Sequence, residues 1–318
     1  MKRRATLLLA LALPCALVAW PGASPSRALA DDAAGPAPTV EQRILERHGT
    51  SILTVHAVLA VRMRFAGQSF DQEQKDDVTA VVVDPSGLLM ISDGSQEMAA
   101  VERQFPGSEL SMTPKTLKVV LPGDETDHDA ILVARDANLG LAFLQVLGLE
   151  GKTLAAVDLA STAEPKLLAP LYGVSRLPRG FDYAPQVQRL YARQHVEQPR
   201  PMWGIAGDFG GSGLPAFDAT GAPVGILITQ SGAVAEGGSS GRALLDMGAF
   251  LLPLAPVHRL LEQVKKRVPE ALEKAKKAAA EPAAAPKDAP PAGVLPTPTP
   301  PTPTPAPKDP PKEPPAGR

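Results

Sequence analysis

Cysteine is almost absent from this chain, whose single Cys15 lies in an apolar N-terminal run among 318 residues. One cysteine forms no intramolecular disulfide and no cysteine-based metal site. Aromatic residues are scarce, at 4% of the chain, and the formal net charge is only −2. A chain without an excess of basic residues lacks the positive field that nucleic-acid binding needs. The sequence therefore excludes a disulfide framework and argues against a nucleic-acid partner.

The first 30 residues have the three parts of a secretory signal peptide. Residues 1–4 are positively charged, residues 5–20 are apolar, and Ala28-Leu29-Ala30 is a small-x-small cleavage site. The alternative is a membrane anchor, but the apolar run of roughly 16 residues is shorter than the ~20 that a spanning helix needs. We therefore predict cleavage after residue 30 and export to the periplasm or the extracellular space. The mature chain then has no thiol nucleophile.

Proline is unevenly distributed and marks the other end of the chain. Of 35 prolines, 15 lie in the last 38 residues. Such a segment has almost nothing to bury, so residues 281–318 are predicted to be disordered, extended and solvated. Before this tail, residues 256–280 have apolar positions at helical spacing, and Pro269 is expected to kink the helix or to start a second one. We predict a linker at 31–40, one folded domain at 41–265 and a helical extension at 266–280.

The folded domain is predicted to be mainly β. Short apolar or alternating segments follow one another, separated by Gly, Pro, Asp and Asn, and no long amphipathic helix interrupts them. Many short strands joined by turns favour a sandwich or a barrel over an α/β sheet. The predicted strands are 51–64, 79–83, 88–92, 117–121, 130–134, 141–146, 166–172, 187–192, 215–217 and 223–229.

A serine among glycines is the sharpest local signal for chemistry. Residues 207–215 read Gly-Asp-Phe-Gly-Gly-Ser-Gly-Leu-Pro, with Ser212 near their centre. Glycines allow a tight turn that projects the serine and directs backbone N–H groups at a developing oxyanion. By itself the motif is more typical of a flexible Gly/Ser loop, so its meaning depends on the rest of the chain.

Four segments, the third of which contains Ser212, resemble in their order the HtrA (DegP-like) branch of the trypsin-like serine peptidases. They are the strand–turn–strand TAVVVDPSGLLMIS at 79–92, AILVARD with LAFL at 130–144, GSGLP through GI at 211–226, and AFLLP with the following helix at 249–264. The resemblance covers roughly residues 42–265 and implies two six-stranded β-barrels. We expect no PDZ module, which is usual in that branch, because residues 281–318 have no predicted strands or helices.

The resemblance carries only one of the three catalytic residues into this chain. The family's serine falls on Ser212, and Gly210 with the Ser212 amide matches the oxyanion site. The family's histidine falls on Gly94 and its aspartate on Gly140, while Leu214 replaces a family glycine. A serine hydroxyl without a base is a weak nucleophile, and loss of the base in triad enzymes costs on the order of 10⁶ in kcat.

We therefore expect an inactive relative of the peptidases that binds a protein or peptide in the cleft between its barrels. The alternative is an active serine endopeptidase in which Ser212 has a displaced or unrecognised base. The neighbouring Asp93 is a poor substitute, since a carboxylate with a pKa of ~3.9 is a weak base for a hydroxyl. A third reading is structural, in which the proline-rich tail contacts the cell wall. No two histidines have i, i+4 metal spacing, and we expect no metal and no cofactor.

Overall fold

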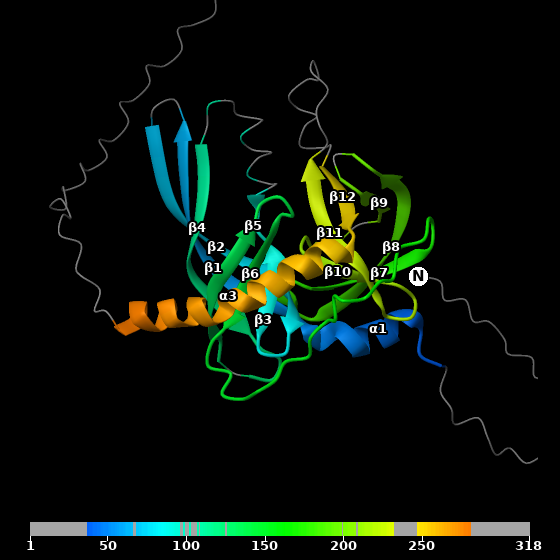
Figure 1. Ribbon diagram of the computed structural model, residues 1–318, viewed down its shortest axis with the longest axis horizontal. Coiled ribbons are helices and arrows are strands. Elements are labelled where there is room, and N and C mark those ends of the chain that lie inside the picture. The colour runs from blue at the N-terminus through cyan, green and yellow to red at the C-terminus, as the bar shows by residue number, and fades with distance from the viewer. Residues whose placement is uncertain are drawn as a thin grey trace, which may run out of the picture.

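The computed structural model describes residues 37–231 and 247–280, except 66–67, 96–97, 99–101, 103–106, 108, 125, 199 and 208. The predicted signal peptide at 1–30 and the predicted tail at 281–318 lie outside these residues. The described chain forms two closed β-barrels of six strands each, with helices at their junction (Figure 1). The prediction of a mainly β protein with two six-stranded barrels and a C-terminal helix is thus confirmed.

Each barrel is formed by consecutive antiparallel strands. The first has the strand order β1-β2-β3-β6-β5-β4 and the second β10-β11-β12-β9-β8-β7. The first barrel comprises β1 (Ile52–Phe65), β2 (Gln68–Asp84), β3 (Leu88–Ser92), β4 (Glu109–Val120), β5 (His128–Asp136) and β6 (Leu141–Val146). The second comprises β7 (Pro170–Arg176), β8 (Pro185–Val196), β9 (Met202–Ala206), β10 (Leu214–Phe217), β11 (Pro223–Ser231) and β12 (Met247–Leu252).

Continuous apolar runs arise where a strand is buried on both faces. In β2, Ala80 and Val82 point into the first barrel, whereas Val81 and Val83 belong to a larger cluster between the barrels. Successive side chains of a strand alternate between its faces, so this segment must be apolar at every position. The second barrel has its own core, which includes Leu190 of β8.

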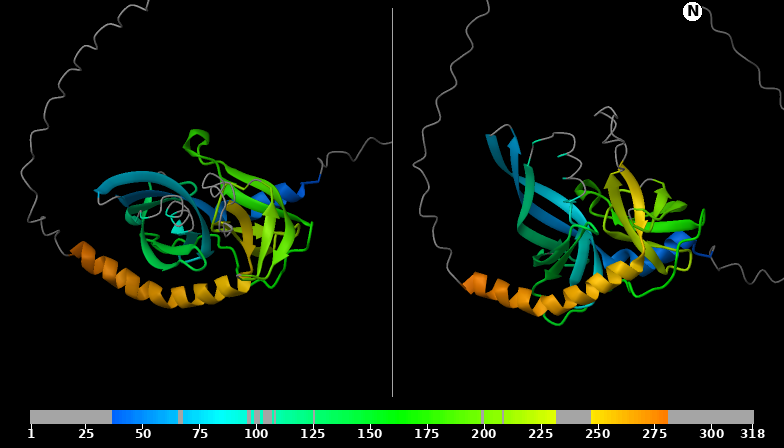
Figure 2. Two further views of the ribbon diagram at one scale, coloured as in Figure 1. Left: turned by 90° about the horizontal axis from the view of Figure 1, so that it is seen from above. Right: turned by 45° about the horizontal axis from the view of Figure 1, so that its top comes forward.

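Two helices cover the junction between the barrels. The first, α1 (Val40–His48), begins with a capping box between Thr39 and Gln42 and ends in the 3₁₀ turn η1 (Gly49–Ser51). The second, α3 (Leu254–Ala280), leaves the second barrel and crosses the first as one curved element (Figure 2). No helix among the described residues combines the length and hydropathy needed to cross a membrane.

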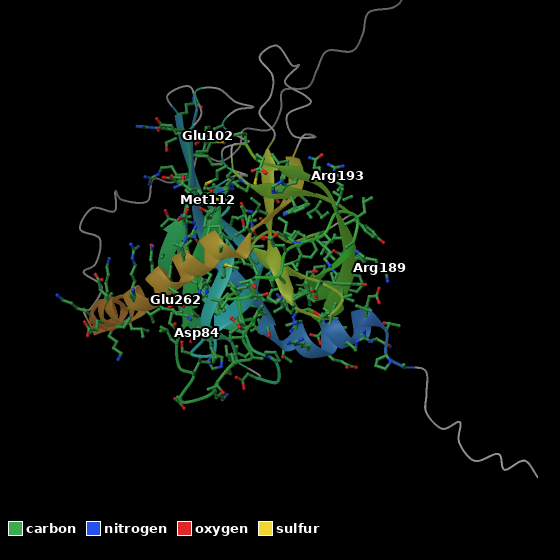
Figure 3. The ribbon with its side chains drawn as sticks, turned by 45° about the vertical axis from the view of Figure 1, so that its right-hand side comes forward. Asp84, Glu102, Met112, Arg189, Arg193 and Glu262 are labelled. Carbon is green, nitrogen blue, oxygen red and sulfur yellow. The ribbon has the colours of Figure 1, made fainter. Side chains whose placement is uncertain are left out.

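The helix α3 continues through Pro269, so this proline does not begin a second helix. The division expected at residue 266 falls inside this one continuous element. Apolar contacts hold the helix upstream of the proline, where Val257 and Val264 are buried. Lys265 Nζ also lies 3.4 Å from Asp84 Oδ2, at the end of β2, and 3.0 Å from Glu262 Oε1; both acidic residues are labelled in Figure 3.

Strands β1, β2 and β4 extend beyond the first barrel as a three-stranded arm (Figure 1). We define the arm as residues 59–65 of β1, residues 68–75 of β2 and residues 109–116 of β4. Its outer face carries ion pairs, among them Arg62 with Asp71 at 2.7 Å and Lys115 with Glu73. Cross-strand pairs of opposite charge stabilise a sheet modestly. The part of β2 that belongs to the arm was not predicted, because the residues of this strand before Thr79 are mostly polar.

Arg176 connects the two barrels at the end of β7. Its guanidinium donates to the carbonyl oxygens of Ile52 in the first barrel, at 2.7 Å, and of Gly49, at 2.9 Å. It also donates to the carbonyl of Tyr183, which follows η2 (Arg179–Phe181), at 3.1 Å. Burial lowers the pKa of Arg176. A planar fork that satisfies three carbonyls fixes the orientation of the barrels more firmly than a single contact would.

His48 should make the stability of the protein fall between neutral and mildly acidic pH. Its ring is buried against Phe217, with ring centroids 4.0 Å apart, and its Nε2 lies 2.9 Å from the Gly221 carbonyl oxygen. Burial lowers the pKa of His48 below its usual 6.5, outweighing the contact with Gly221. On acidification the unfolded chain therefore takes up this proton first, and stability present above about pH 6.5 is lost as the pH falls through the lower folded pKa.

Urea unfolding of the wild type and of His48→Gln between pH 5 and 7.5 checks this expectation. Glutamine stays neutral and still offers an N–H to the Gly221 carbonyl. The free energy of unfolding of the wild type should decrease relative to that of His48→Gln as the pH is lowered. Parallel profiles would show that the imidazole titrates alike in both states.

Candidate active-site region

The serine loop connects β9 to β10 and is packed directly on the first barrel. Gly213 has φ of +82°, a region that side chains disfavour, and its amide donates to the Leu227 carbonyl at 2.7 Å. A Cβ at this position would collide with the backbone of β3, lying 2.7 Å from the carbonyl carbon of Ile91. Glycine is therefore required for the second barrel to place its serine beside the end of β3.

The Ser212 hydroxyl is hydrogen-bonded within its own barrel. Its Oγ accepts from the backbone amide of Thr229 in β11 at 3.2 Å, and the side chain is half-buried. It is the only hydrogen bond between this hydroxyl and the described residues. An amide N–H is a donor, so it cannot accept the hydroxyl proton during nucleophilic attack.

The positions assigned by resemblance lie close together. Gly94, Gly210 and Ser212 all line one cavity. Gly140 lies beside them, since its carbonyl accepts from the amide of Asp93 at 3.0 Å. Gly94 and Gly140 have φ of +69° and +71°. The two segments that would carry the histidine and aspartate of a triad therefore converge on the serine loop, but neither provides a side chain.

All five histidines lie in the described part of the chain, and none of them lines this cavity. His48 packs on Phe217, and His258 lies on α3. The other three contact carboxylates: His56 with Asp77 at 2.6 Å, His128 with Asp124 at 2.9 Å and His195 with Glu197 at 3.0 Å. No imidazole is therefore available to the Ser212 hydroxyl in this conformation.

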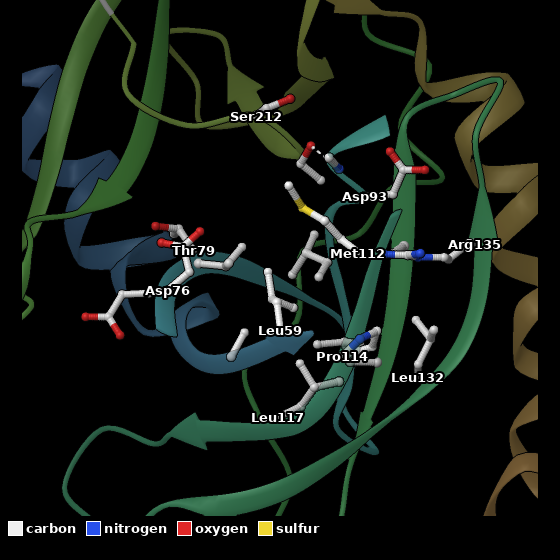
Figure 4. A pocket seen from close by; sticks show the side chains of 18 of the residues that line it. Leu59, Asp76, Thr79, Asp93, Met112, Pro114, Leu117, Leu132, Arg135 and Ser212 are labelled. Atoms are coloured by element: carbon white, nitrogen blue, oxygen red, sulfur yellow. Dashed lines mark hydrogen bonds between the residues drawn. The ribbon is translucent and has the colours of Figure 1, made fainter. Parts of the chain in front are cut away.

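Asp93 is the titratable side chain next to the vacant histidine position. It is only 8% exposed, and its Oδ1 accepts from the Ser95 amide at 2.9 Å. This hydrogen bond closes a turn two residues long, which is a common structural use of aspartate. In Figure 4, Asp93 and Ser212 project from different segments around the cavity.

The cavity itself occupies the open end of the first barrel and has a volume of about 380 Å³. All six strands of that barrel contribute to it, and Gly210, Gly211 and Ser212 of the serine loop line it as well. Figure 4 shows Ser212 at the edge of the cavity. Apolar side chains form its interior, namely Leu59, Ile91, Met112, Pro114, Leu117, Leu132 and Leu144. Charged side chains line it as well, namely Asp76, Asp77, Asp93 and Arg135.

Sequence reasoning did not identify the residues of the arm that line this cavity. Larger apolar residues alternate with small or polar ones in Leu59-Ala60-Val61-Arg62-Met63 and in Leu110-Ser111-Met112-Thr113-Pro114. This alternation is the signal that could have located an inward face on both strands. Within the described residues, no three His, Cys, Asp or Glu side chains gather as metal ligands.

Comparison with protein-family models finds no match for this chain, and comparison with curated proteins finds none either. The architecture therefore has to be judged on its own geometry. Two closed, six-stranded antiparallel barrels fit, in general terms, the trypsin-like double-barrel fold.

Proposed function

We propose that this protein is an exported, noncatalytic relative of the HtrA-like serine peptidases that binds a protein or peptide between its barrels. The observation that carries the proposal is the environment of Ser212, whose hydroxyl accepts from the Thr229 amide while all five histidines lie elsewhere. Without a base, hydrolysis falls by on the order of 10⁶ in kcat. A cleft beside a serine that cannot react is suited to binding without cleavage.

The shape of the region supports a binding role. A cavity with an apolar interior and a few charged groups at its edge is the usual form of a ligand site. Here it adjoins the serine loop, so a bound chain would pass Ser212 as it does in a peptidase. Export rests on the signal-like residues 1–30, and contact with the cell wall on the proline-rich residues 281–318.

Binding and cleavage of an unfolded protein distinguish this proposal from the active endopeptidase. The probe is fluorescein-labelled, reduced and carboxymethylated α-lactalbumin, with binding followed by anisotropy and cleavage by gel electrophoresis. We expect the wild type and Ser212→Ala to bind the probe equally and to leave it intact. Cleavage that disappears in Ser212→Ala would instead establish the endopeptidase, and the absence of binding by either chain would contradict a binding role.

The structural alternative makes a different prediction. If the tail performs the function by contacting the cell wall, deletion of residues 281–318 should change the location of the protein and its binding of partners. Unchanged location and binding after this deletion would count against a structural role for the tail.

A further inference from the structure

We propose that the cavity in the first barrel is an anchor site for an extended peptide that carries a large apolar side chain next to a lysine or arginine. The proposal rests on the proposed binding function and names the ligand class for the same region. The apolar side chain enters the barrel, and the cationic side chain lies at Asp76 and Asp93. Four features of the structure support this assignment.

The first feature is a gap in the barrel wall. Strands β4 and β5 pair only at Lys118–Asp129 and Val119–His128 within the described residues. Beyond these positions β5 continues alongside β6 as far as Asp136, while β4 follows β1 into the arm. Both strands line the cavity where they separate, β4 through Met112 and β5 through Leu132. At this gap, no pairing between β4 and β5 closes the wall beside the cavity.

The second feature is the unpaired edge of β4 along this gap. Residues 109–116 pair with β1 on one side, and no described strand pairs with them on the other. The Leu110 amide donates to Glu102 Oε1 at 3.2 Å and Pro114 has no N–H, so the edge offers a peptide the amide of Met112 and its carbonyl oxygens. In an antiparallel sheet, alternate residues direct their N–H and C=O groups away from the paired neighbour. An extended peptide is the ligand that such an edge recognises, because it supplies complementary backbone groups along its length.

The third feature is an apolar strip that continues from the cavity onto the arm. The register places Leu59 opposite Pro114, Val61 opposite Met112 and Met63 opposite Leu110. These pairs share the face that lines the cavity, since Leu59, Met112 and Pro114 all reach it (Figure 4). At its outer end, Met63 is 40% exposed, and Phe70, which pairs with it, is 52% exposed. Val61, in the middle of the strip, is 6% exposed, so apolar side chains of an extended ligand would find partners at Met63 and Phe70 and in the cavity.

The fourth feature is the charge around the cavity, which is lined by three carboxylates and by one guanidinium, that of Arg135. Asp77 is already engaged, accepting from the Tyr183 hydroxyl at 3.0 Å and contacting His56. Asp76, which is exposed, and Asp93, whose Oδ1 accepts from the Ser95 amide, form no ion pair with another described residue. Carboxylates beside an apolar cavity favour a cationic neighbour to the anchoring side chain.

The volume of the cavity fits one large side chain. At about 380 Å³ it is at the lower end of the range of ligand pockets, and an aromatic residue fills a good part of such a space. Replacement of a buried phenylalanine by alanine in the ligand should weaken binding about 10- to 100-fold, from the apolar surface that stays in water.

Three fluorescein-labelled nine-residue peptides test the assignment. All contain only Gly, Ser and Thr around a central pair, which is Lys-Phe, Lys-Ala or Glu-Phe. Anisotropy titrations use the purified full chain. We expect the Lys-Phe peptide to bind most tightly, the Lys-Ala peptide about 10- to 100-fold more weakly, and the Glu-Phe peptide several-fold more weakly with the difference reduced by salt. Equal affinities, or no binding of the Lys-Phe peptide, would overturn the proposal.

Two variants of adjacent residues locate the peptide. Met112→Trp fills the cavity, whereas Ser111→Trp places the same side chain on the outer face of β4. Binding of the Lys-Phe peptide should be lost in the first and kept in the second, and thermal unfolding verifies that both are folded. The exposed Asp76→Asn is a further variant, which should reduce the preference for Lys-Phe over Glu-Phe even if Met112→Trp does not fold.

The unfolded α-lactalbumin probe separates failure of the anchor site from failure of the binding function. If Met112→Trp is folded and keeps its affinity for the Lys-Phe peptide, the anchor assignment is overturned. Binding of α-lactalbumin by the wild type would in that case leave the general binding role standing. If the wild type binds neither probe, both proposals fail together.

Discussion

Gly213→Val should destabilise the protein by about 4 kcal/mol or more, the range of the most damaging single substitutions. A side chain at φ of +82° costs about 1–2 kcal/mol in backbone strain alone. The larger effect is the collision of Cβ with the backbone of Ser92 and with the Ile91 carbonyl carbon, at 2.7 Å. Neither is a flexible side chain that can move aside. Urea unfolding or a thermal melt measures the loss.

Gly210→Ala is the matched control in the same loop. A Cβ at this position meets no heavy atom within 4 Å, and its φ lies outside the left-handed region. Its free energy of unfolding should stay within about 0.5 kcal/mol of the wild type. If Gly213→Val were as stable as Gly210→Ala, the serine loop would not be packed on β3, and the placement of Ser212 beside Gly94 would lose its support.

Gly94→His combined with Gly140→Asp should create weak esterase activity towards p-nitrophenyl acetate. The double variant supplies the base and its orienting carboxylate on the two segments that converge on the serine loop. A Cβ at Gly94 meets nothing within 4 Å, so the imidazole has room. A positioned base typically contributes 10²–10⁴-fold, and we expect a gain on the order of 10² over the wild type.

The expected gain in activity is at the low end of this 10²–10⁴-fold range, because the backbone at both positions is in the left-handed region, with φ of +69° and +71°. Each substitution therefore strains the backbone by about 1–2 kcal/mol and tilts the new side chain from its ideal direction. Addition of Ser212→Ala to the double variant should remove the gain. A folded double variant with the activity of the wild type would show that these positions are not those of a triad.

The strands and hairpins could be predicted because their signals are local, whereas their arrangement in two six-stranded barrels was implied by the resemblance. Apolar segments such as 79–83 and 88–92, joined by an Asp-Pro-Ser-Gly turn, specify a hairpin whatever surrounds them. The arm could not be predicted from its own sequence, because the part of β2 before Thr79 is held by pairing with β1 and by ion pairs across strands. Such contacts depend on register, which is set by the partner strand and not by the segment itself. The continuous path of α3 through Pro269 depends likewise on its contacts with the barrels.

In the candidate site, too, some features could be predicted from the sequence and others could not. The order of motifs along the chain was enough to assign Gly94, Gly140, Gly210 and Ser212, and the structure brings these positions together. The cavity beside them could not be predicted from the sequence, since it arises where β4 separates from β5. No single segment encodes that separation. The bond from the Thr229 amide to Ser212 likewise depends on how β11 lies against the serine loop.

Labelling of the wild-type chain by a fluorophosphonate probe is the most direct test of the claim that Ser212 has no base. The adduct is measured by intact-protein mass spectrometry, followed by peptide mapping, with Ser212→Ala as the control. We expect the wild type to acquire no more adduct than Ser212→Ala over hours. Stoichiometric labelling of Ser212 within minutes would contradict it.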